Sequence, residues 1–157
     1  MPGLKQMFVQ GLTERSTVAK DVLGDIRVEG NKTYKYVKYT TGTGAVAAVA
    51  GNVCYYTKDD VANEGYVNHR VTSDLSDSYN LGAGVLMAAL ANNEFGWIQI
   101  KGVATLTTAL TAGADGNALT ALGATDGTLD VSALVTDEIC AFAADASAKI
   151  VICDFRY

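Results

Sequence analysis

The residues of this chain that could take part in acid–base chemistry are few and widely spaced. Its single histidine, His69, stands beside Arg70 in a segment of alternating polar and apolar residues. A general base needs a partner group and a pocket, and the sequence contains no G-x-S-x-G motif that would supply a nucleophile. We therefore interpret His69 as a surface or interface residue. The sequence predicts no catalytic residue and no enzyme.

A glycine-rich segment over residues 42–47, GTGAVA, matches the G-x-G-x-x-A pattern of dinucleotide-binding turns. That chemistry requires a helix directly after the glycines, because the pyrophosphate lies at the helix N-terminus. Only a few residues separate Gly44 from Gly51, which is too short for a crossover helix. The spacing therefore favours an ordinary loop, and no cofactor is predicted.

Acidic residues gather in two expected loops, with Asp59, Asp60 and Glu64 in one and Asp74 and Asp77 in the other. Flexible loops rich in carboxylates can hold Ca²⁺, but neither group has the EF-hand spacing. We favour solvated turn residues and keep a Ca²⁺ site as the alternative. No metal ligand is predicted.

Six aromatic side chains could form a face on which a sugar ring stacks, although such residues more often fill a core or an interface. They are Tyr34, Tyr36, Tyr39, Tyr55, Tyr56 and Trp97. The favoured interpretation is a core or an interface, and sugar binding is the alternative.

The three cysteines are far apart in the sequence and form no C-x-x-C pair: Cys54, Cys140 and Cys153. A structural zinc site needs four ligands, and the chain has one histidine to add to these cysteines. An odd number of cysteines also argues against a secreted disulfide scaffold. We interpret them as free buried thiols that pack as small hydrophobic side chains.

Composition narrows the class of protein further. The chain has 157 residues, enough for one domain with a core, and a formal net charge of -5 with 18% charged residues. A nucleic-acid binder is expected to carry a basic patch, so nucleic acid is not predicted as a partner. No apolar run reaches the length of a membrane span, and no signal peptide is recognisable. We expect a soluble protein made in a reducing cytoplasm.

Strand-like segments recur along the chain with turn residues between them, which is typical of an all-β sandwich or barrel. The pattern predicts a single compact β-barrel or β-sandwich domain over residues 24–157, after an extended arm over residues 1–23. The expected elements are a hairpin over 24–41, a strand over 53–57, an alternating strand over 66–72, a loop over 73–80, two hairpin-like units within 109–137 and a final hairpin over 138–157.

The stretch over residues 81–107 shows the clearest pattern. Its alternation places Ile98 and Ile100 on one strand face, with Trp97, Gln99 and Lys101 on the other. We expect the two isoleucines to point into the core. We interpret the stretch as a hairpin followed by a bent third strand beyond the glycine at position 102.

The arm over residues 1–23 contains many apolar residues but only weak periodicity, and Gly3 and Gly11 interrupt it. Such a segment either drapes over its own domain or reaches a neighbour. Because exposed apolar surface is costly, we expect it to dock on a neighbouring subunit or on a larger assembly. Its deletion is then expected to leave the domain folded, with little change in the unfolding midpoint, and to weaken association at least about tenfold.

Three stretches resemble segments of tailed-bacteriophage head proteins. They are LGDIRVEGNKTYKYVKY followed by GNVCYYT, then GVLMAALANNEFGWIQIKGVATL, and finally DEICAFAADASAKIVICDF. The likeness extends from about residue 23 to residue 155. It implies a capsid decoration (cement) protein or a related head auxiliary protein.

The resemblance also implies partners and a location. Such proteins bind the major capsid protein on the outside of the icosahedral shell, often as homotrimers, and stabilise the shell against internal DNA pressure. The protein would be synthesised in the host bacterial cytoplasm and end on the capsid exterior of the virion. No site residue is carried over, because the family has no catalytic motif.

Two further classes stay open. One is a head or tail fibre module that binds a host receptor or carbohydrate, and the other is a small carbohydrate-binding β-domain. Copy number separates the first from a decoration protein, because fibre modules are scarce in the virion while decoration proteins approach the abundance of the shell protein.

Overall fold

The computed structural model describes residues 7–58 and 64–156 of the chain. These residues form strands and one short helix, so the all-β prediction is confirmed. The elements are β1 (Ile26–Glu29), β2 (Lys32–Tyr39), β3 (Val53–Thr57), α1 (Glu64–Val67), β4 (Arg70–Thr72), β5 (Ser78–Leu86), β6 (Phe95–Thr105), β7 (Ala118–Thr120), β8 (Asp130–Val131), β9 (Ala141–Asp145) and β10 (Ile150–Asp154).

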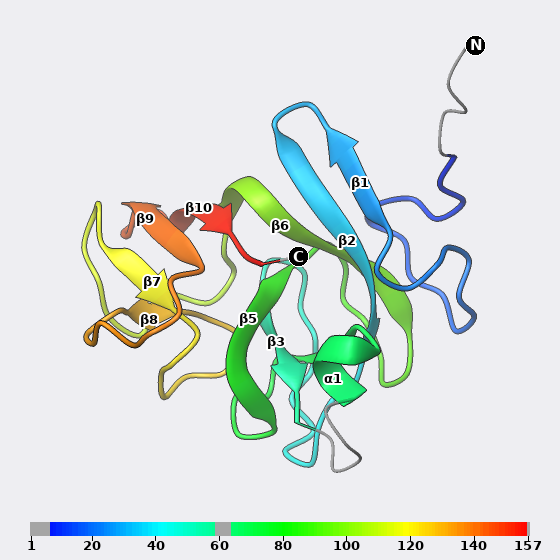
Figure 1. The fold of residues 1–157 in the computed structure, drawn as a ribbon, viewed down its shortest axis with the longest axis horizontal. Coiled ribbons are helices and arrows are strands. Elements are labelled where there is room, and N and C mark those ends of the chain that lie inside the picture. The colour runs from blue at the N-terminus through cyan, green and yellow to red at the C-terminus, as the bar shows by residue number, and fades with distance from the viewer. Residues whose placement is uncertain (1–6, 59–63, 157) are drawn as a thin grey trace.

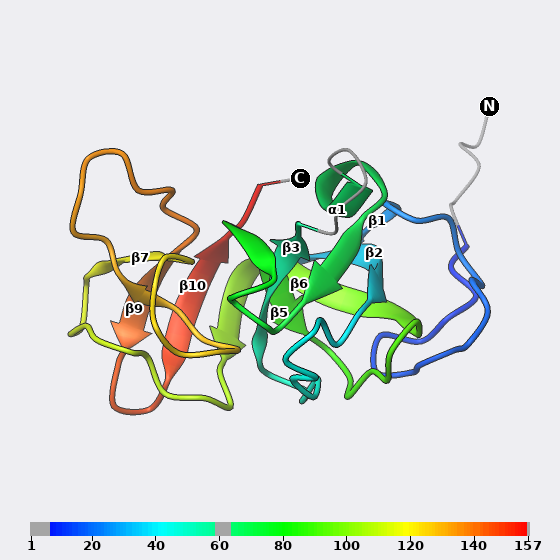
Figure 2. The ribbon, with the colours of Figure 1, turned by 90° about the horizontal axis from the view of Figure 1, so that it is seen from below.

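The strands belong to one sheet with the order β1-β2-β4-β3-β5-β6-β10-β9-β7-β8, and β2 also pairs with β6. That additional pairing closes β2, β4, β3, β5 and β6 into a circuit. Strands β10, β9, β7 and β8 continue outward from β6 as an extension, and β1 pairs with β2 outside the circuit. Figures 1 and 2 show the circuit and the extension as two adjoining halves of the molecule, with β6 running between them.

The predicted hairpin over residues 24–41 is confirmed as β1 and β2. Its two-residue connection starts at Gly30, whose φ of 59° is readily adopted by glycine. Strand β2 is tyrosine-rich, which suits a pleated and largely covered position. It pairs along most of its length with β6, and the register places Tyr36 opposite Trp97.

The inner face of this strand pair forms the main core. Val37 and Tyr39 from β2 lie with Ile98 and Ile100 from β6 in one buried cluster, and all four side chains are fully covered. The cluster continues into the extension through residues such as Val151. The expectation that both isoleucines point into the core is confirmed, because the alternation of β6 holds.

The outer face of the same pair carries a second buried cluster, which the N-terminal arm covers. Trp97 and Tyr36 are the centre of this cluster, and Phe8, Leu12 and Leu23 pack against it. The Phe8 ring meets Trp97 edge to face, with 5.1 Å between the ring centroids. The arm therefore lies on its own sheet, on the side of the molecule away from β7–β9 (Figures 1 and 2).

Gln10 fastens the arm to the sheet through hydrogen bonds. The indole Nε1 of Trp97 donates to the Gln10 carbonyl at 3.1 Å, and the Tyr36 hydroxyl donates to Gln10 Oε1 at 2.6 Å. Gln10 Nε2 in turn donates to the Phe95 carbonyl at 2.9 Å. These contacts correct the expectation that the arm finds its partner on another subunit or assembly. Phe8, Leu12 and Leu23 find it within their own domain, whereas Val9, Val18 and Val22 stay largely exposed.

The strand expected over residues 66–72 is wrong in its first half. Residues 64–67 form α1, and strand β4 begins only at Arg70. The chain turns between them at His69, which has a φ of 52° and cannot continue an extended strand. Gly65 also packs so closely on the Thr57 carbonyl that a larger residue would collide with it.

Three other boundaries differ from the expectation. Strand β5 begins at Ser78, inside the loop expected over residues 73–80. The third strand expected beyond Gly102 is the continuation of β6, because the glycine adopts a φ of 92° without ending the strand. Residues 109–137 contain only the short paired strands β7 and β8, not two hairpin-like units. The final hairpin is confirmed as β9 and β10.

Candidate binding surfaces

The glycine-rich segment over residues 42–47 is a loop without a helix, as its spacing indicates. The backbone N–H of Thr43 donates to the carboxylate of Asp77, and that of Gly44 donates to Asp74 Oδ2 at 3.0 Å. A side chain at Gly44 would collide with the Asp74 carboxylate. The amides that a phosphate would require are therefore engaged by the protein's own carboxylates.

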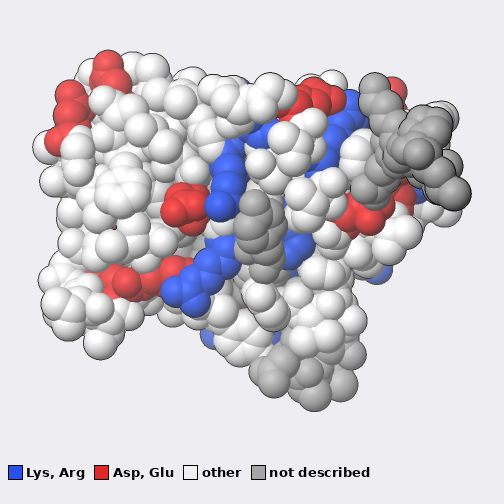
Figure 3. Space-filling view, turned by 45° about the horizontal axis from the view of Figure 1, so that its top comes forward, with Lys and Arg blue, Asp and Glu red and all other residues white. Residues whose placement is uncertain are grey.

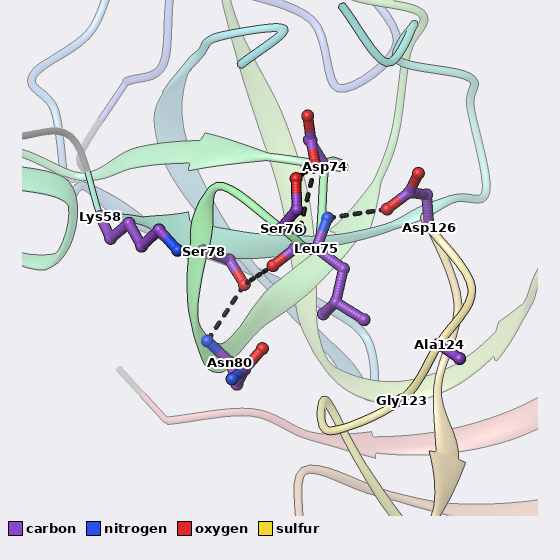
Figure 4. A pocket seen from close by; sticks show the side chains of 9 residues that line it. All are labelled: Lys58, Asp74, Leu75, Ser76, Ser78, Asn80, Gly123, Ala124 and Asp126. Atoms are coloured by element: carbon purple, nitrogen blue, oxygen red, sulfur yellow. Dashed lines mark hydrogen bonds between the residues drawn. The ribbon is translucent and has the colours of Figure 1, made fainter. Parts of the chain in front are cut away.

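The acidic loop over residues 73–77 also uses its carboxylates to accept hydrogen bonds from the protein itself. A hollow of about 450 Å³ lies beside this loop (Figure 4). Asp74 Oδ1 accepts hydrogen bonds from the backbone and hydroxyl of Ser76, and Asp126 Oδ1 accepts one from the backbone of Leu75. Among the described residues, no group of three His, Cys, Asp or Glu side chains is placed to hold a metal. The earlier acidic group at Asp59 and Asp60 lies outside them.

His69 is half-buried at the turn before β4. Burial lowers the pKa of its imidazole, and the nearby positive charge of Lys35 lowers it further. The imidazole Nδ1 is buried and meets no hydrogen-bond partner among the residues that the structure describes. The histidine packs on Gly24, where any added Cβ would collide with the ring. Its contacts thus join the start of the β-domain to β4.

The six aromatic side chains considered for sugar stacking are all buried, which rules them out as an exposed platform. Tyr34, Tyr36, Tyr39, Tyr55, Tyr56 and Trp97 are each 5% exposed or less. They fill the two clusters on either side of the β2–β6 pair or lie beside them. Interpreting them as core residues is therefore confirmed.

The three cysteines are free and buried, as predicted. Burial raises the pKa of the Cys153 thiol to about 12, and it raises the pKa values of Cys54 and Cys140 as well. A thiol with a raised pKa is a poor nucleophile and a poor metal ligand. These residues therefore act as small hydrophobic groups in the core.

An exposed apolar surface that the sequence reasoning missed lies beside α1. Tyr66 and Val67 from the helix and Tyr79 and Leu81 from β5 line a hollow of about 480 Å³. Tyr66 is 47% exposed and Tyr79 is 39% exposed. The Tyr66 ring is braced from behind by Tyr56, with the ring centroids 5.0 Å apart. We name these four residues the Tyr66 surface.

A smaller and more polar hollow of about 190 Å³ adjoins the Tyr66 surface and shares Tyr66 and Leu81 with it. Glu138 and Arg156 provide its charged lining, and Arg156 Nε lies 3.1 Å from Glu138 Oε1. The other carboxylate oxygen, Oε2, is buried and makes no well-aligned hydrogen bond in the described part of the chain, and the backbone N–H of Gly82 lies near the carboxylate. Burial raises the pKa of the Glu138 carboxyl despite the charge of Arg156.

A buried cation lies behind the two hollows. Lys35 Nζ donates a hydrogen bond to the Tyr56 hydroxyl at 3.0 Å, and it lies 5.3 Å from the centre of the Tyr56 ring. Because the ammonium group is covered by protein, its pKa is lowered. Lys35 thus holds Tyr56 in position, and Tyr56 supports Tyr66.

A second exposed apolar surface lies on the outer face of the extension. Cross-strand pairing aligns Val103 of β6 with Ile152 of β10, and Ile152 with Phe142 of β9. These side chains are 44%, 46% and 42% exposed, respectively. We name these three residues the Ile152 row. Figure 3 shows no Lys or Arg, but several Asp or Glu side chains, on the side of the molecule that holds β7–β9 in Figure 1, whereas Lys and Arg gather near the centre.

Comparison with known proteins identifies no relative of this chain. No protein-family model matches the chain, and neither the curated proteins nor the solved structures contain a match. Within the described residues, no helix is long and apolar enough to cross a membrane.

Proposed function

We propose that this protein is a decoration (cement) protein that binds the outer surface of a bacteriophage icosahedral shell and stabilises it. The three sequence stretches that resemble phage head proteins support this proposal. A sheet domain without a cluster of catalytic groups in its described part, and with much uncharged surface, is also suited to a structural role. The major capsid protein is the proposed partner.

The observation that carries the proposal is the Ile152 row. An antiparallel sheet with one face on the core normally presents polar residues on its other face. Here three apolar side chains from adjacent strands stand together in solvent. Contiguous exposed apolar patches mark surfaces that bind another protein. The shell is therefore proposed to cover the outer face of β6, β10 and β9.

Shell binding is tested by adding the purified protein to undecorated shells of the phage that encodes it and measuring occupancy by sedimentation. Ile152→Lys places a charge in the middle of the row and is expected to weaken binding at least about tenfold, since burying an unpaired charge is costly. Val28→Lys is the matched control, because Val28 is an exposed strand residue on β1, which β2 separates from β6. Equal occupancy of the two variants would contradict the proposed surface.

Self-association is part of the same proposal, with a homotrimer as the assembly that the resemblance implies. Sedimentation equilibrium over a range of protein concentrations measures it in solution. A monomeric mass at high micromolar concentration would contradict a trimer in solution. Trimer formation on the shell would then have to be measured on decorated shells.

A fibre module that binds a host receptor remains the alternative. The copy number of the protein in purified virions separates the two proposals. A number near that of the shell protein supports decoration, and a few copies per particle support a fibre.

A further inference from the structure

We propose that the hollow between Tyr66, Glu138 and Arg156 is a binding site for a neutral saccharide. This inference does not depend on the shell-binding proposal, because it concerns another surface of the molecule. It assigns a ligand to the small hollow and to the Tyr66 surface beside it.

The polar side of the hollow is matched to a sugar hydroxyl pair. Glu138 Oε1 faces Arg156, whereas Oε2 is buried and makes no well-aligned hydrogen bond among the described residues, although the backbone N–H of Gly82 lies close enough to favour the charged carboxylate. A carboxylate whose hydrogen bonding is incomplete is unfavourable when it is buried, and a ligand hydroxyl would donate to the part of Glu138 that lines the hollow. The guanidinium carries further N–H groups beyond Nε, and Arg156 is largely exposed. A carboxylate and a guanidinium side by side can therefore bind neighbouring hydroxyls, one as acceptor and the other as donor.

The apolar side of the hollow is matched to the flat C–H face of a pyranose ring. Tyr66 is braced against Tyr56 and presents the remainder of its ring to solvent. Aromatic side chains with one apolar and one wet end suit such amphipathic ligands. Because Lys35 holds the Tyr56 hydroxyl from behind, the aromatic pair is fixed before a ligand arrives.

The sizes of the two hollows define the ligand more closely. The polar hollow of about 190 Å³ is below the range of roughly 300–1,000 Å³ typical of drug-sized ligands, so it takes one ring. The Tyr66 surface continues from it as a hollow of about 480 Å³ with Tyr79 on its far side. A second sugar unit would lie there. The charges of the paired Glu138 carboxylate and Arg156 guanidinium balance, which matches a ligand without net charge.

The test uses ligand-observed saturation-transfer NMR on the full chain. The probes are the methyl pyranosides of glucose, galactose and mannose, together with maltose and lactose. At least one probe is expected to bind saturably with a Kd of about 1 mM or tighter. Disaccharides are expected to bind more tightly than the corresponding single rings.

Site variants connect binding to this hollow. Tyr66→Ala and Glu138→Gln are each expected to weaken binding at least about fivefold, roughly 1 kcal/mol by the usual conversion. Phe142→Ala, which removes an aromatic side chain of similar exposure from the Ile152 row, is expected to leave it unchanged. If Tyr66→Ala fails to fold, Glu138→Gln and Arg156→Met carry the test, because Arg156 lies at the surface.

Two results would overturn the proposal. One is the absence of binding by every probe up to about 20 mM, well above the expected Kd. The other is binding that survives both Tyr66→Ala and Glu138→Gln. Loss of shell occupancy in Tyr66→Ala without any saccharide binding would assign the hollow to the shell instead.

Discussion

Strand β6 presents one outward face to two different surroundings. Near its start, Trp97 lies beneath residues 8–23 and is fully buried, whereas beyond Gly102 the side chain of Val103 stands in solvent beside Ile152. Both residues belong to the same alternating set, so the strand pattern does not distinguish them. The difference comes from the reach of the arm, which ends its contacts before the extension begins. Exposure of an apolar strand face is thus decided by a separate segment of chain.

The largest expected effect on stability comes from removing the arm that covers Trp97. Deleting residues 1–23 should lower the free energy of unfolding by at least about 4 kcal/mol. It strips packing from Trp97 and Tyr36, where losses of a large side chain cost about 3–5 kcal/mol, and it leaves buried donors unpaired. Urea denaturation followed by circular dichroism measures the change. An unaltered midpoint would show that the arm only rests on the sheet.

The inner face of β6 offers a comparison that the arm does not affect. Ile100→Ala should lower the free energy of unfolding by about 2–5 kcal/mol through lost burial and a cavity. Ile152→Ala, the same change at an exposed strand position, should cost less than about 0.5 kcal/mol. Similar losses at both positions would mean that the two faces of the sheet are not as different as their exposure indicates.

Gln10 tests whether the arm is held by hydrogen bonds as well as by packing. Gln10→Ala should cost about 1–3 kcal/mol, because the Tyr36 hydroxyl loses a buried acceptor. The neighbouring Val9→Ala, at a largely exposed position, should change stability by less than about 0.5 kcal/mol. The denaturation midpoints of the two variants give the answer. Equal midpoints would leave the arm fastened by apolar packing and by its backbone hydrogen bonds, which the substitution does not remove.

The smallest effect on stability is expected at Val103, on the part of β6 that the arm does not cover. Val103→Thr keeps the β-branched shape and should change the free energy of unfolding by no more than about 0.5 kcal/mol, because the side chain is already in contact with water. A loss above about 1.5 kcal/mol, as for a buried hydroxyl without a partner, would show that Val103 is covered in solution by another copy of the chain. Repeating the measurement at low protein concentration tests this, because the loss should then become smaller as the copies dissociate.

Local patterns in the sequence were sufficient for much of the sheet. The alternation around Ile98 and Ile100 identified the inner face, and the turn at Gly30 identified the first hairpin. The position of the arm could not be predicted in the same way. Its hydrogen bonds come from Gln10 and from a backbone bridge between Ser16 and Phe95, and their partners on β2 and β6 are distant in the sequence and leave no periodic signal.

The candidate saccharide site could not be predicted from the sequence for a similar reason. Glu138 and Tyr66 come from distant segments, and only the folded sheet brings them to one hollow. The serine and aspartate residues around Tyr79 indicate a loop, although Tyr79 belongs to β5. The aromatic residues in the strongest strand patterns were core residues, since a pattern that predicts a strand also predicts that its side chains are covered.

Trp97 is the single tryptophan of the chain, and it lies at the contact between the arm and β6. Indole emission moves to longer wavelength when the ring meets water. Detachment of the arm would therefore change the colour of the light that the protein emits, while events at β7–β9 would leave it unaltered. Tryptophan fluorescence therefore reports on the half of the molecule that the arm covers, and it follows the arm in real time without an added label.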